Sequence, residues 1–363
     1  MREFVSHIKK LDWTLLAAAI ILMAIGLVSI YSSSLAKGDF FNFQKQLIFA
    51  VTGLFLVFLF SFLDYRTLRN DSYFVFSLYL ICLLALAGLF FFAPEIRGVK
   101  SWYKIGLFSL DPLEFTKIIL IILLAKYFSR RHIEVYRIRH IFFSGFYVFL
   151  PAILVFLRPD LGSVLILIFL WLLILVISGI KLRAFLTLLF CGLMILALGW
   201  SFLLKDYQKE RIWNFITPQA DPLIGGWSQN QSKIAIGSGG IWGQGLGQGP
   251  QTQYGFLSEP QTDFIFAALA EEFGLIGVLI ILGLLLFLVW RIIKIALTSQ
   301  SNFPRLFAIG FAGLLVIQIF INIGMNLGLL PIIGISLPLI GYGGSGLIAL
   351  SVGLGVLESI KSH

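Results

Sequence analysis

Three acidic side chains stand out because each lies at the head of an apolar stretch long enough to enter a membrane. They are Glu114 in "DPLEFTK", Asp160 in "LRPDLGS" and Asp263 in "EPQTDFIFAALAEEFG". A carboxylate near hydrocarbon is costly and generally faces a cavity or a cationic partner. Held in such a place, a carboxylate can serve as a general base or as a ligand for a cation.

Helix capping explains each of these acids equally well when it is taken alone. Asp111 and Glu114 have the spacing of an N-cap and a capping-box glutamate around a first-turn proline. Asp160 is placed as an N-cap, and Asp263 is expected in a first helical turn, where the helix dipole favours negative charge. Lys117 follows Glu114 by three residues and is its expected partner on one helix face. The recurrence of this setting favours a function in addition to capping.

The composition places these residues in an integral membrane protein. The chain has 363 residues, of which 59% are hydrophobic and only 12% are charged. Soluble domains carry about 25% charged residues, so this chain is too apolar to be one. Cys82 and Cys191 lie in apolar stretches and suggest neither a disulfide framework nor a metal site.

The apolar stretches predict an all-α, polytopic fold, since about 20 apolar helical residues cross the hydrocarbon core. We predict ten membrane-spanning helices in a single domain covering residues 1–363. Their starts are expected near Trp13, Lys45, Ser72, Pro112, His140, Leu161, Ala184, Asp263, Arg305 and Leu337.

The net charge of +9 is explained by topology rather than by a nucleic-acid partner. With ten spans and the N-terminus inside, sixteen of the 27 Lys and Arg residues fall on the cytoplasmic side and ten on the outer side. Four of those ten lie in one long loop, where the charge rule is weak. The asymmetry predicts that both termini are cytoplasmic.

A polar, glycine-rich and aromatic segment, residues 204–262, separates the seventh and eighth predicted spans. Loops of this length are usually functional or disordered. Its aromatic residues, such as Trp213 and Trp227, favour an ordered extracytoplasmic cap with short interfacial helices. The sequence "GQGLGQG" resembles a phosphate cradle, but no strand and helix flank it as a nucleotide-binding motif requires. Tight turns and close backbone packing explain these glycines better.

The stretch "NIGMNLGLLPIIGISLPLIGYGGSGL", residues 322–347, gives a second signal. It combines Asn322, Asn326, two prolines and a cluster of small residues. Small residues let membrane helices approach closely, whereas a broken helix is tolerated where protein covers it or where it lines a cavity. Both interpretations remain open from the sequence.

These motifs together resemble the SEDS family (shape, elongation, division and sporulation). The resemblance covers nearly the whole chain, and its most specific parts are "EPQTDFIFAALAEEFG", "QSKIAIGSGG", "RPDLGS", "PLEFTK" and the 322–347 stretch. Within the family, "NIGMNLGLLP" and "GISLPLIGYGGS" are more similar to RodA members than to FtsW members.

The resemblance implies a peptidoglycan glycosyltransferase of the cytoplasmic (inner) membrane that joins lipid II units on the extracytoplasmic face, for cell elongation and rod shape. Asp263 matches the family's essential aspartate and is the expected general base. Lipid II leaves as a pyrophosphate that needs no protonation, so one carboxylate is enough, whereas glycoside hydrolases need two. An α-linked donor that gives a β-linked product requires inversion.

The resemblance and the topology also suggest groups that bind substrate. Basic residues at the outer face, Arg158 among them, are the best placed to hold the two pyrophosphates. A divalent cation such as Mg²⁺ could share that work, although no ligand spacing demands one. The expected substrate-binding residues are Lys45, Glu114, Lys117, Asp160, Arg211, Ser232, Lys233, Thr262 and Ser345. Lys45 replaces a more usual arginine, and Gln261 replaces a frequent histidine.

The expected partners are lipid II, the growing glycan strand, a class B penicillin-binding protein with transpeptidase activity, and other membrane proteins of the elongation complex. Two alternative functions remain open. A lipid II flippase would also need intramembrane charge in a cavity. A non-catalytic scaffold for the cell-wall machinery would need none of the acids for chemistry.

Overall fold

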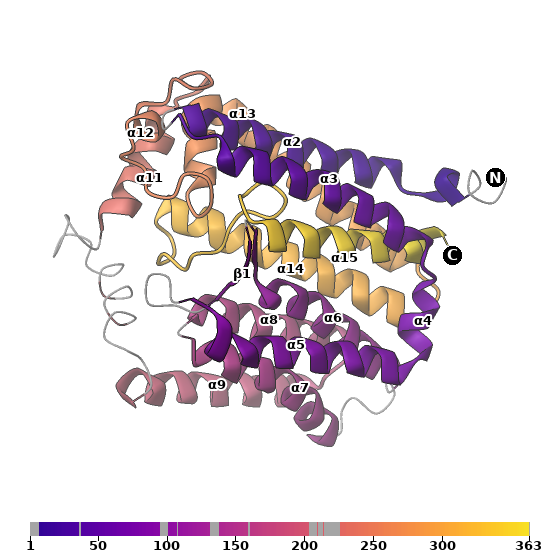
Figure 1. Cartoon of the computed structure of the whole chain (residues 1–363). Coiled ribbons are helices and arrows are strands. Elements are labelled where there is room, and N and C mark those ends of the chain that lie inside the picture. Colours follow the sequence, from indigo (N-terminus) through magenta and orange to yellow (C-terminus); the bar gives the residue numbers. More distant parts are fainter. Residues whose placement is uncertain are drawn as a thin grey trace.

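The structure is a computed structural model, and it describes residues 7–35, 38–94, 101–106, 108–130, 138–158, 160–202, 209, 213 and 226–362. The described chain is built almost entirely of helices that run roughly alongside one another (Figure 1). One short antiparallel hairpin, β1 (Tyr103–Ile105) with β2 (Phe108–Leu110), is added to them.

The long helices begin close to the positions that the apolar stretches predict. They are α2 (Trp13–Leu35), α3 (Phe41–Phe62), α5 (Ser72–Phe92), α6 (Pro112–Ser129), α7 (Ile138–Phe156), α8 (Leu161–Ile177), α9 (Leu182–Phe202), α13 (Ile265–Thr298), α14 (Asn302–Leu327) and α15 (Gly344–Ser362). Three shorter helices are α4 (Tyr65–Asn70), α11 (Trp227–Ser238) and α12 (Pro250–Gln253).

Seven of the described helices are long and apolar enough to cross a membrane: α2, α3, α5, α7, α13, α14 and α15. The prediction of a helical, polytopic membrane protein is therefore confirmed. Helix α8 is apolar but has 17 residues, and α6 carries three charged side chains. The total of ten spans stays a prediction.

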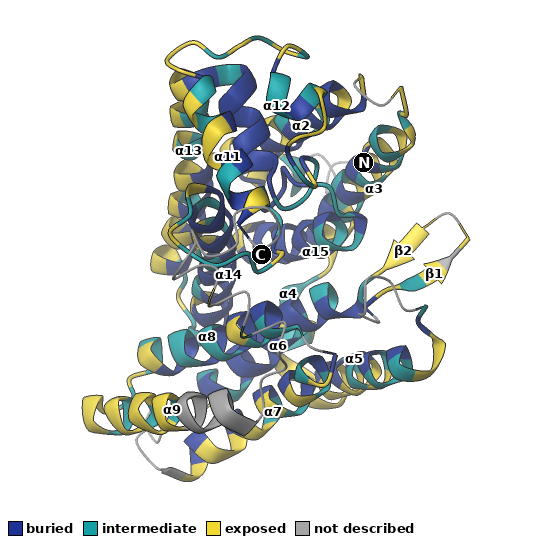
Figure 2. Cartoon of the chain, turned by 90° about the vertical axis from the view of Figure 1, so that its left-hand side faces the viewer, coloured by how far each residue is buried: buried dark blue, intermediate teal, exposed yellow. Residues whose placement is uncertain are grey.

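Burial divides the bundle into a packed centre and an apolar outer surface. Helix α14 lies in the centre, where it contacts α6, α8 and α13, and α15 packs along α3. The outer faces of α5, α7 and α9 are exposed (Figure 2). Large apolar side chains such as Leu84 on α5 and Phe190 on α9 point outward, as expected of a surface covered by lipid.

The last predicted span begins later than expected. Helix α15 starts at Gly344, and the 331–343 segment before it has no helical structure. The prediction of a start near Leu337 is wrong because Pro331 and Pro338 lack the N–H group that a continuous helix requires. Leu337 and Ile340 are nevertheless buried, so the segment is packed into the protein.

Close packing and an interrupted helix occur together in this region. A methyl group on Gly26 of α2 would overlap the carbonyl oxygen of Ile340 in the 331–343 segment. Only glycine lets α2 approach this backbone so closely. Within the 322–347 stretch, a methyl group on Gly344 would overlap the Phe49 ring of α3, so close packing and a broken helix both occur there.

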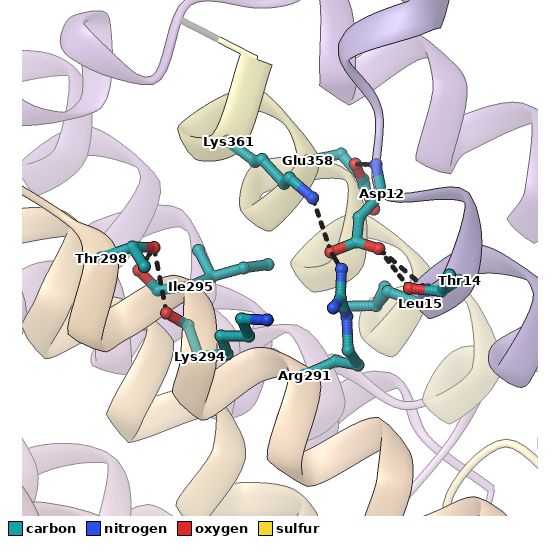
Figure 3. A network of polar contacts seen from close by, with 9 residues as sticks. All are labelled: Asp12, Thr14, Leu15, Arg291, Lys294, Ile295, Thr298, Glu358 and Lys361. Atoms are coloured by element: carbon teal, nitrogen blue, oxygen red, sulfur yellow. Dashed lines mark hydrogen bonds and ion pairs between the residues drawn. The ribbon is translucent and has the colours of Figure 1, made fainter.

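A charged network joins three elements at the end of the bundle where α2 begins and α15 ends (Figure 3). The carboxylate of Asp12, just before α2, accepts hydrogen bonds from Arg291 of α13 and from Lys361 Nζ of α15, the latter at 2.8 Å. The Asp12 N–H donates to Glu358 Oε2 at 2.7 Å. Asp12 is 2% exposed, whereas the Lys361 side chain is 35% exposed, so the carboxylate end of the network is shielded from water.

The charge of Asp12 depends on this network. Burial raises the pKa of Asp12, but hydrogen bonds from Lys361, Thr14, Arg291 and the Leu15 N–H outweigh burial and hold the pKa below its usual range. A folded-state pKa below the unfolded value of about 3.9 stabilises the fold at neutral pH. That stabilisation is lost as the pH falls through the acidic range.

Replacing the buried carboxylate should loosen the attachment of the N-terminal helix. We expect Asp12→Asn to lower the free energy of unfolding by about 2 kcal/mol, because Arg291 and Lys361 lose their shared counter-ion. Thermal unfolding of the purified protein in detergent micelles measures the change. Asp39→Asn, at an exposed carboxylate that accepts a bond from the Phe41 N–H, is the matched control. Equal melting temperatures for the two variants would contradict the assignment.

Candidate active site

Asp263 lies at the end of the bundle opposite to the Asp12 network, and hydrogen bonds to its backbone hold it in place. Its carbonyl oxygen accepts hydrogen bonds from Asn322 Nδ2 at 3.0 Å and from Asn326 Nδ2 at 2.9 Å. The two asparagines are four residues apart on α14, so both face α13, and both are fully buried. Asn322 Nδ2 also donates to Ile335 O at 2.8 Å. Helix α14 thereby fixes the backbone of Asp263 and the 331–343 segment together.

Asn326 extends this attachment to α11. Its carbonyl oxygen accepts a 2.8 Å hydrogen bond from Ser232 Oγ, and its side-chain oxygen accepts a 3.1 Å bond from the Ala267 N–H. Ser232 is fully buried. One asparagine therefore joins α11, α13 and α14 next to Asp263, and the hydroxyl group of Ser232 has a structural role.

The side chain of Asp263 lies outside the regular helix. Phe264 is the N-cap of α13, so Asp263 precedes the first turn, and the prediction that it lies in that turn is wrong. Tertiary contacts of its backbone, rather than a cap, determine its conformation. A methyl group on Gly334 would lie 3.8 Å from Asp263 Oδ2. The half-buried carboxylate therefore faces the 331–343 segment.

Two glutamines anchor the far end of that segment. Gln261, two residues before Asp263, accepts a hydrogen bond at its carbonyl oxygen from the Tyr342 N–H at 2.7 Å. Gln46 of α3 donates to Gly341 O and accepts from the Gly343 N–H, each at 3.3 Å. Each end of the 331–343 segment is thus fixed to a helix that also positions Asp263 or its neighbours.

The glutamine at position 261 suits this place because an amide both donates and accepts. Its side-chain oxygen accepts from Asn42 Nδ2 at 2.8 Å, and its side-chain nitrogen donates to Ser34 Oγ at 3.3 Å. Asn42 lies on α3 and Ser34 on α2. Gln261 therefore connects the first two long helices to the stretch that carries Asp263.

Glu114 and Lys117 lie on the other side of the 331–343 segment. Lys117 Nζ is 2.7 Å from Glu114 Oε1, which confirms the predicted pair, and the side chains are 3% and 23% exposed. Glu114 lines a cavity of about 20 Å³ together with Gln318 and Ser336, which is room for about one water molecule. Gln318 Oε1 is buried and has no hydrogen-bond partner among the described residues.

Asp111 and Asp160 cap helices, as the sequence predicts. Asp111 accepts a hydrogen bond from the Leu113 N–H at 2.9 Å and begins α6, and Asp160 accepts from the Ser163 N–H at 3.1 Å and begins α8. The predicted capping box does not form, because the Asp111 N–H donates to Ser345 Oγ at 2.8 Å instead of to Glu114. Pairing with Lys117 keeps the Glu114 carboxylate away from the cap.

Arg158 supplies positive charge between these two caps. It is 3% exposed and follows the end of α7. Burial lowers its pKa, and the carboxylates of Asp111 and Asp160 act in the opposite direction. The capping carboxylates of α6 and α8 therefore both act on one buried cation.

The remaining cations that the sequence predicts in the site lie at its margin. Lys45 is half-buried, with its ammonium group 3.9 Å from the centre of the Phe41 ring. Lys233 is exposed on α11 and packs against Gly328, where a methyl group would overlap Lys233 Cε. Arg211 lies outside the described residues.

Two hydroxyl residues of the prediction are placed by the backbone. Thr262 is half-buried, and its N–H donates to Glu259 O at 3.2 Å. Ser345, at the start of α15, donates to Ser109 O of β2 at 3.3 Å. Among the residues that the structure describes, no three His, Cys, Asp or Glu side chains come together in a way that could hold a metal ion.

A break in α13 explains the glycine-rich loop that precedes Asp263. Gly274 has φ 64° and ψ −167°, which interrupts the helix and frees backbone groups on both sides. The loop supplies partners for them. The four bonds are Gln244 N to Glu271 O at 2.9 Å, Gly245 N to Glu272 O at 3.1 Å, Leu275 N to Gly240 O at 2.9 Å and Ile276 N to Ile241 O at 3.2 Å.

Glu271 and Glu272, which the sequence analysis left without a role, hold the rest of this loop. The buried Glu271 carboxylate accepts bonds from the Gln251 N–H at 2.7 Å, the Thr252 N–H at 3.0 Å and Thr252 Oγ1 at 2.7 Å. Glu272 accepts from the Gly247 N–H at 3.2 Å and from the Ser32 hydroxyl group. Backbone carbonyl groups and the Glu272 carboxylate therefore already bind the N–H groups of "GQGLGQG" that a phosphate cradle would need. Adjacent acids beside a glycine in an apolar helix were the sequence signal for this arrangement.

Comparison with known proteins identifies the family. The sequence profile of the FtsW, RodA and SpoVE family of cell cycle proteins matches residues 12–363. The chain belongs to this family. It is 38% identical to the peptidoglycan glycosyltransferase MrdB of Escherichia coli (strain K12) over 286 residues, which cover 79% of this chain and 77% of that protein.

The chain is also similar to FtsW members of the family. It is 36% identical over 375 residues to a probable peptidoglycan glycosyltransferase FtsW of Geobacter metallireducens, with 98% of this chain and 96% of that protein covered. A solved structure that concerns the coordination of polymerization and crosslinking by a peptidoglycan synthase complex has a TM-score of 0.82 and 32% identity. It covers 97% of each chain.

A substitution that adds one methyl group to the glycine-rich loop can test its contact with the break in α13. We expect Gly243→Ala to destabilise the protein by roughly 2 to 4 kcal/mol, because the added methyl would overlap Glu272 O and because φ is +85° at this position. Gly237→Ala, where the methyl meets open space at the end of α11, should change stability little. Thermal unfolding and limited proteolysis measure the effect. A Gly243→Ala protein as stable as the control would show that the loop does not depend on the break.

Proposed function

We propose that this chain polymerises lipid II into β-1,4 glycan strands, with inversion and with Asp263 as the general base. The observation that carries the proposal is the placement of Asp263, whose backbone is fixed by two buried asparagines while its half-buried carboxylate faces the irregular 331–343 segment. The predicted enzyme class is confirmed, since relatives at 36% and 38% identity are named peptidoglycan glycosyltransferases.

The chemistry needs only one proton acceptor. The 4-hydroxyl oxygen of the acceptor sugar attacks the anomeric carbon of the donor, and its proton passes to the Asp263 carboxylate. The bond between that carbon and the pyrophosphate oxygen breaks, and undecaprenyl pyrophosphate leaves with the electron pair. Because the attack and the departure occur on opposite faces, an α-linked donor gives a β-linked product.

Rigid placement of the base supports this role. A general base must lie within hydrogen-bond reach of the proton that it removes, and small displacements are costly. Asn322 and Asn326 hold the Asp263 carbonyl oxygen and are themselves fully buried. The carboxylate therefore projects from a fixed backbone position. Asp263 is half-buried, so part of the residue is accessible.

Charged groups around the site supply binding for two pyrophosphates. We assign this role to Lys117, Lys45, Lys233, Arg158 and Arg211, with Glu114 orienting Lys117 through the 2.7 Å ion pair. Asp160, Thr262, Ser345 and Ser232 shape the surroundings through their backbone and side-chain hydrogen bonds. A Mg²⁺ ion in this reaction would be held mainly by substrate phosphates, as is usual for that ion.

The topology that we propose has ten spans, both termini in the cytoplasm and the Asp263 end facing outward across the inner membrane. Residues 204–262 are the proposed cap over that face, and α11 and α12 are helices of its described part. Residues 204–208, 210–212 and 214–225 of the proposed cap lie outside the described residues. We also propose a class B penicillin-binding protein as partner, with support from the solved structure of a complex that coordinates polymerization and crosslinking.

A role in elongation rather than division is the finer part of the proposal. It rests on "NIGMNLGLLP" and "GISLPLIGYGGS", which resemble RodA members. In the structure this region contains the asparagines that hold Asp263 and the irregular segment that faces it. The sequence difference between the branches therefore lies beside the proposed site.

Removing the proton acceptor should abolish polymer formation without unfolding the protein. We expect Asp263→Asn to lower the rate of glycan synthesis from purified lipid II by at least about 10³-fold, since an amide cannot take the proton. Gel analysis of labelled glycan strands measures the rate, with and without a class B penicillin-binding protein. Asp64→Asn, at an exposed helix cap on the opposite end, is the control.

The alternative functions give different outcomes in the same preparation. A flippase would move lipid II across liposome membranes and form no polymer, and a scaffold would do neither. Full activity of the Asp263→Asn protein, at the melting temperature of the wild type, would overturn the assignment of Asp263 as the base.

The elongation role is tested in cells. We expect the wild-type chain to restore rod shape to a rod-shaped bacterium depleted of its own elongation polymerase, and not to restore division to one depleted of its division polymerase. The Asp263→Asn chain, produced at the same level, should restore neither. Restoration of division alone would overturn the elongation role while leaving the polymerase proposal intact.

A further inference from the structure

A second cavity lies at the end of the protein that carries the Asp12 network, far from Asp263. It has a volume of about 390 Å³, within the range of binding pockets for small ligands and head groups. Its lining is polar and comes from α4, the end of α6 and the connection between α13 and α14. The lining residues are Arg69, Asn70, Ser129, Arg130, Gln300, Ser301, Asn302 and Phe303. From Asn302 to Asn326 beside Asp263, α14 extends roughly 36 Å.

Two arginines give this cavity its charge. Arg130 is fixed in place, because its guanidinium group donates to Ser72 Oγ at 3.2 Å and to the carbonyl oxygens of Arg69 and Asn70 at 3.1 Å. Arg69 Nε donates to Asn70 Oδ1 at 3.2 Å. Within the described part of the chain, neither arginine forms an ion pair with a carboxylate. Their positive charge is therefore available to a ligand.

The nearby acidic side chains, Asp64 and Asp71, cap helix N-termini. Asp64 accepts a hydrogen bond from the Arg66 N–H at 2.8 Å, and Asp71 accepts one from the Phe74 N–H at 3.1 Å. Lys126 adds a further cation, bonded to Leu68 O at 3.0 Å. The local charge around the cavity is thus positive.

The start of α14 adds hydrogen-bond donors to the same cavity. Ser301 is the N-cap, and its side chain makes no capping bond. The first N–H groups of a helix attract anions through their dipoles and are a common place for phosphate. Here they lie beside two arginines that line the same cavity, so the cavity combines charge with directed donors.

We propose that this cavity binds the phosphate of an anionic phospholipid head group. Phosphate suits the positive charge of the two arginines and the N–H groups of the helix N-terminus. A lipid is favoured over a soluble phosphate because the cavity borders the apolar surface. Tyr73 and Phe74, at the start of α5, are 89% and 42% exposed and lie three and four residues beyond Asn70. Basic pockets between membrane helices on the cytoplasmic side commonly bind anionic lipids.

The proposal is independent of the polymerase reaction, so it is tested by binding alone. The full-length protein in detergent micelles is titrated with phosphatidylglycerol, phosphatidylcholine or inorganic phosphate, and bound lipid is counted by native mass spectrometry. We expect phosphatidylglycerol to bind at least fivefold more tightly than phosphatidylcholine. Arg69→Gln should weaken phosphatidylglycerol binding about fivefold, as expected for one arginine at an anionic head group.

Two further variants separate binding from folding. Asn302→Asp places a negative charge at the first residue of α14, which favours the helix but repels phosphate, so it should weaken lipid binding without lowering the melting temperature. Arg183→Gln removes the same charge from an exposed residue of α9 that does not line the cavity, and should change binding less than twofold.

Three results would overturn the proposal. Equal binding of the two lipids by the wild type would show that the cavity does not select an anionic head group. An equal loss in Arg69→Gln and Arg183→Gln would indicate general surface charge. Displacement of phosphatidylglycerol by millimolar inorganic phosphate would assign the site to a soluble anion instead of a lipid.

Discussion

The structure depends on pairing the backbone groups that interrupted helices leave free. An unpaired N–H or C=O group in an apolar surrounding costs several kcal/mol, so a broken helix needs partners from elsewhere in the protein. At Gly274 the glycine-rich loop supplies four such bonds. Across the 331–343 segment, Asn322, Gln46 and Gln261 supply the others. Both interrupted regions therefore have a fixed backbone conformation.

Asp263 lies between these two interrupted regions, the break at Gly274 and the 331–343 segment. The carbonyls freed near Gly274 bind the loop before Asp263, and the amides of α14 bind the backbone of Asp263 itself. The buried carboxylates of Glu271 and Glu272 also pair free backbone groups, because they accept hydrogen bonds from N–H groups of the loop. Glu271 and Glu272 thus hold the backbone, whereas the backbone of Asp263 is itself held by its neighbours.

Several features could be predicted from the sequence because interactions between residues close together in the chain determine them. The apolar stretches located the starts of the long helices other than α15 to within a few residues, since the burial of each stretch in a membrane depends on its length and composition. Asp111 and Asp160 were identifiable as caps, and Lys117 as the partner of Glu114, because these contacts span only a few residues. The capping box at Glu114 failed because distant Ser345 competes for the Asp111 N–H.

The sequence by itself determined the membrane class, the helices and the presence of an acid at residue 263, because composition, helical length and motif are properties of the chain alone. Only the tertiary structure decided that α15 starts at Gly344, that Glu271 and Glu272 hold the glycine-rich loop, and that Asn322 and Asn326 hold Asp263. The reason is that a freed N–H or C=O group can be satisfied by many donors or acceptors of similar energy. Which partner it meets depends on how helices far apart in the sequence pack together.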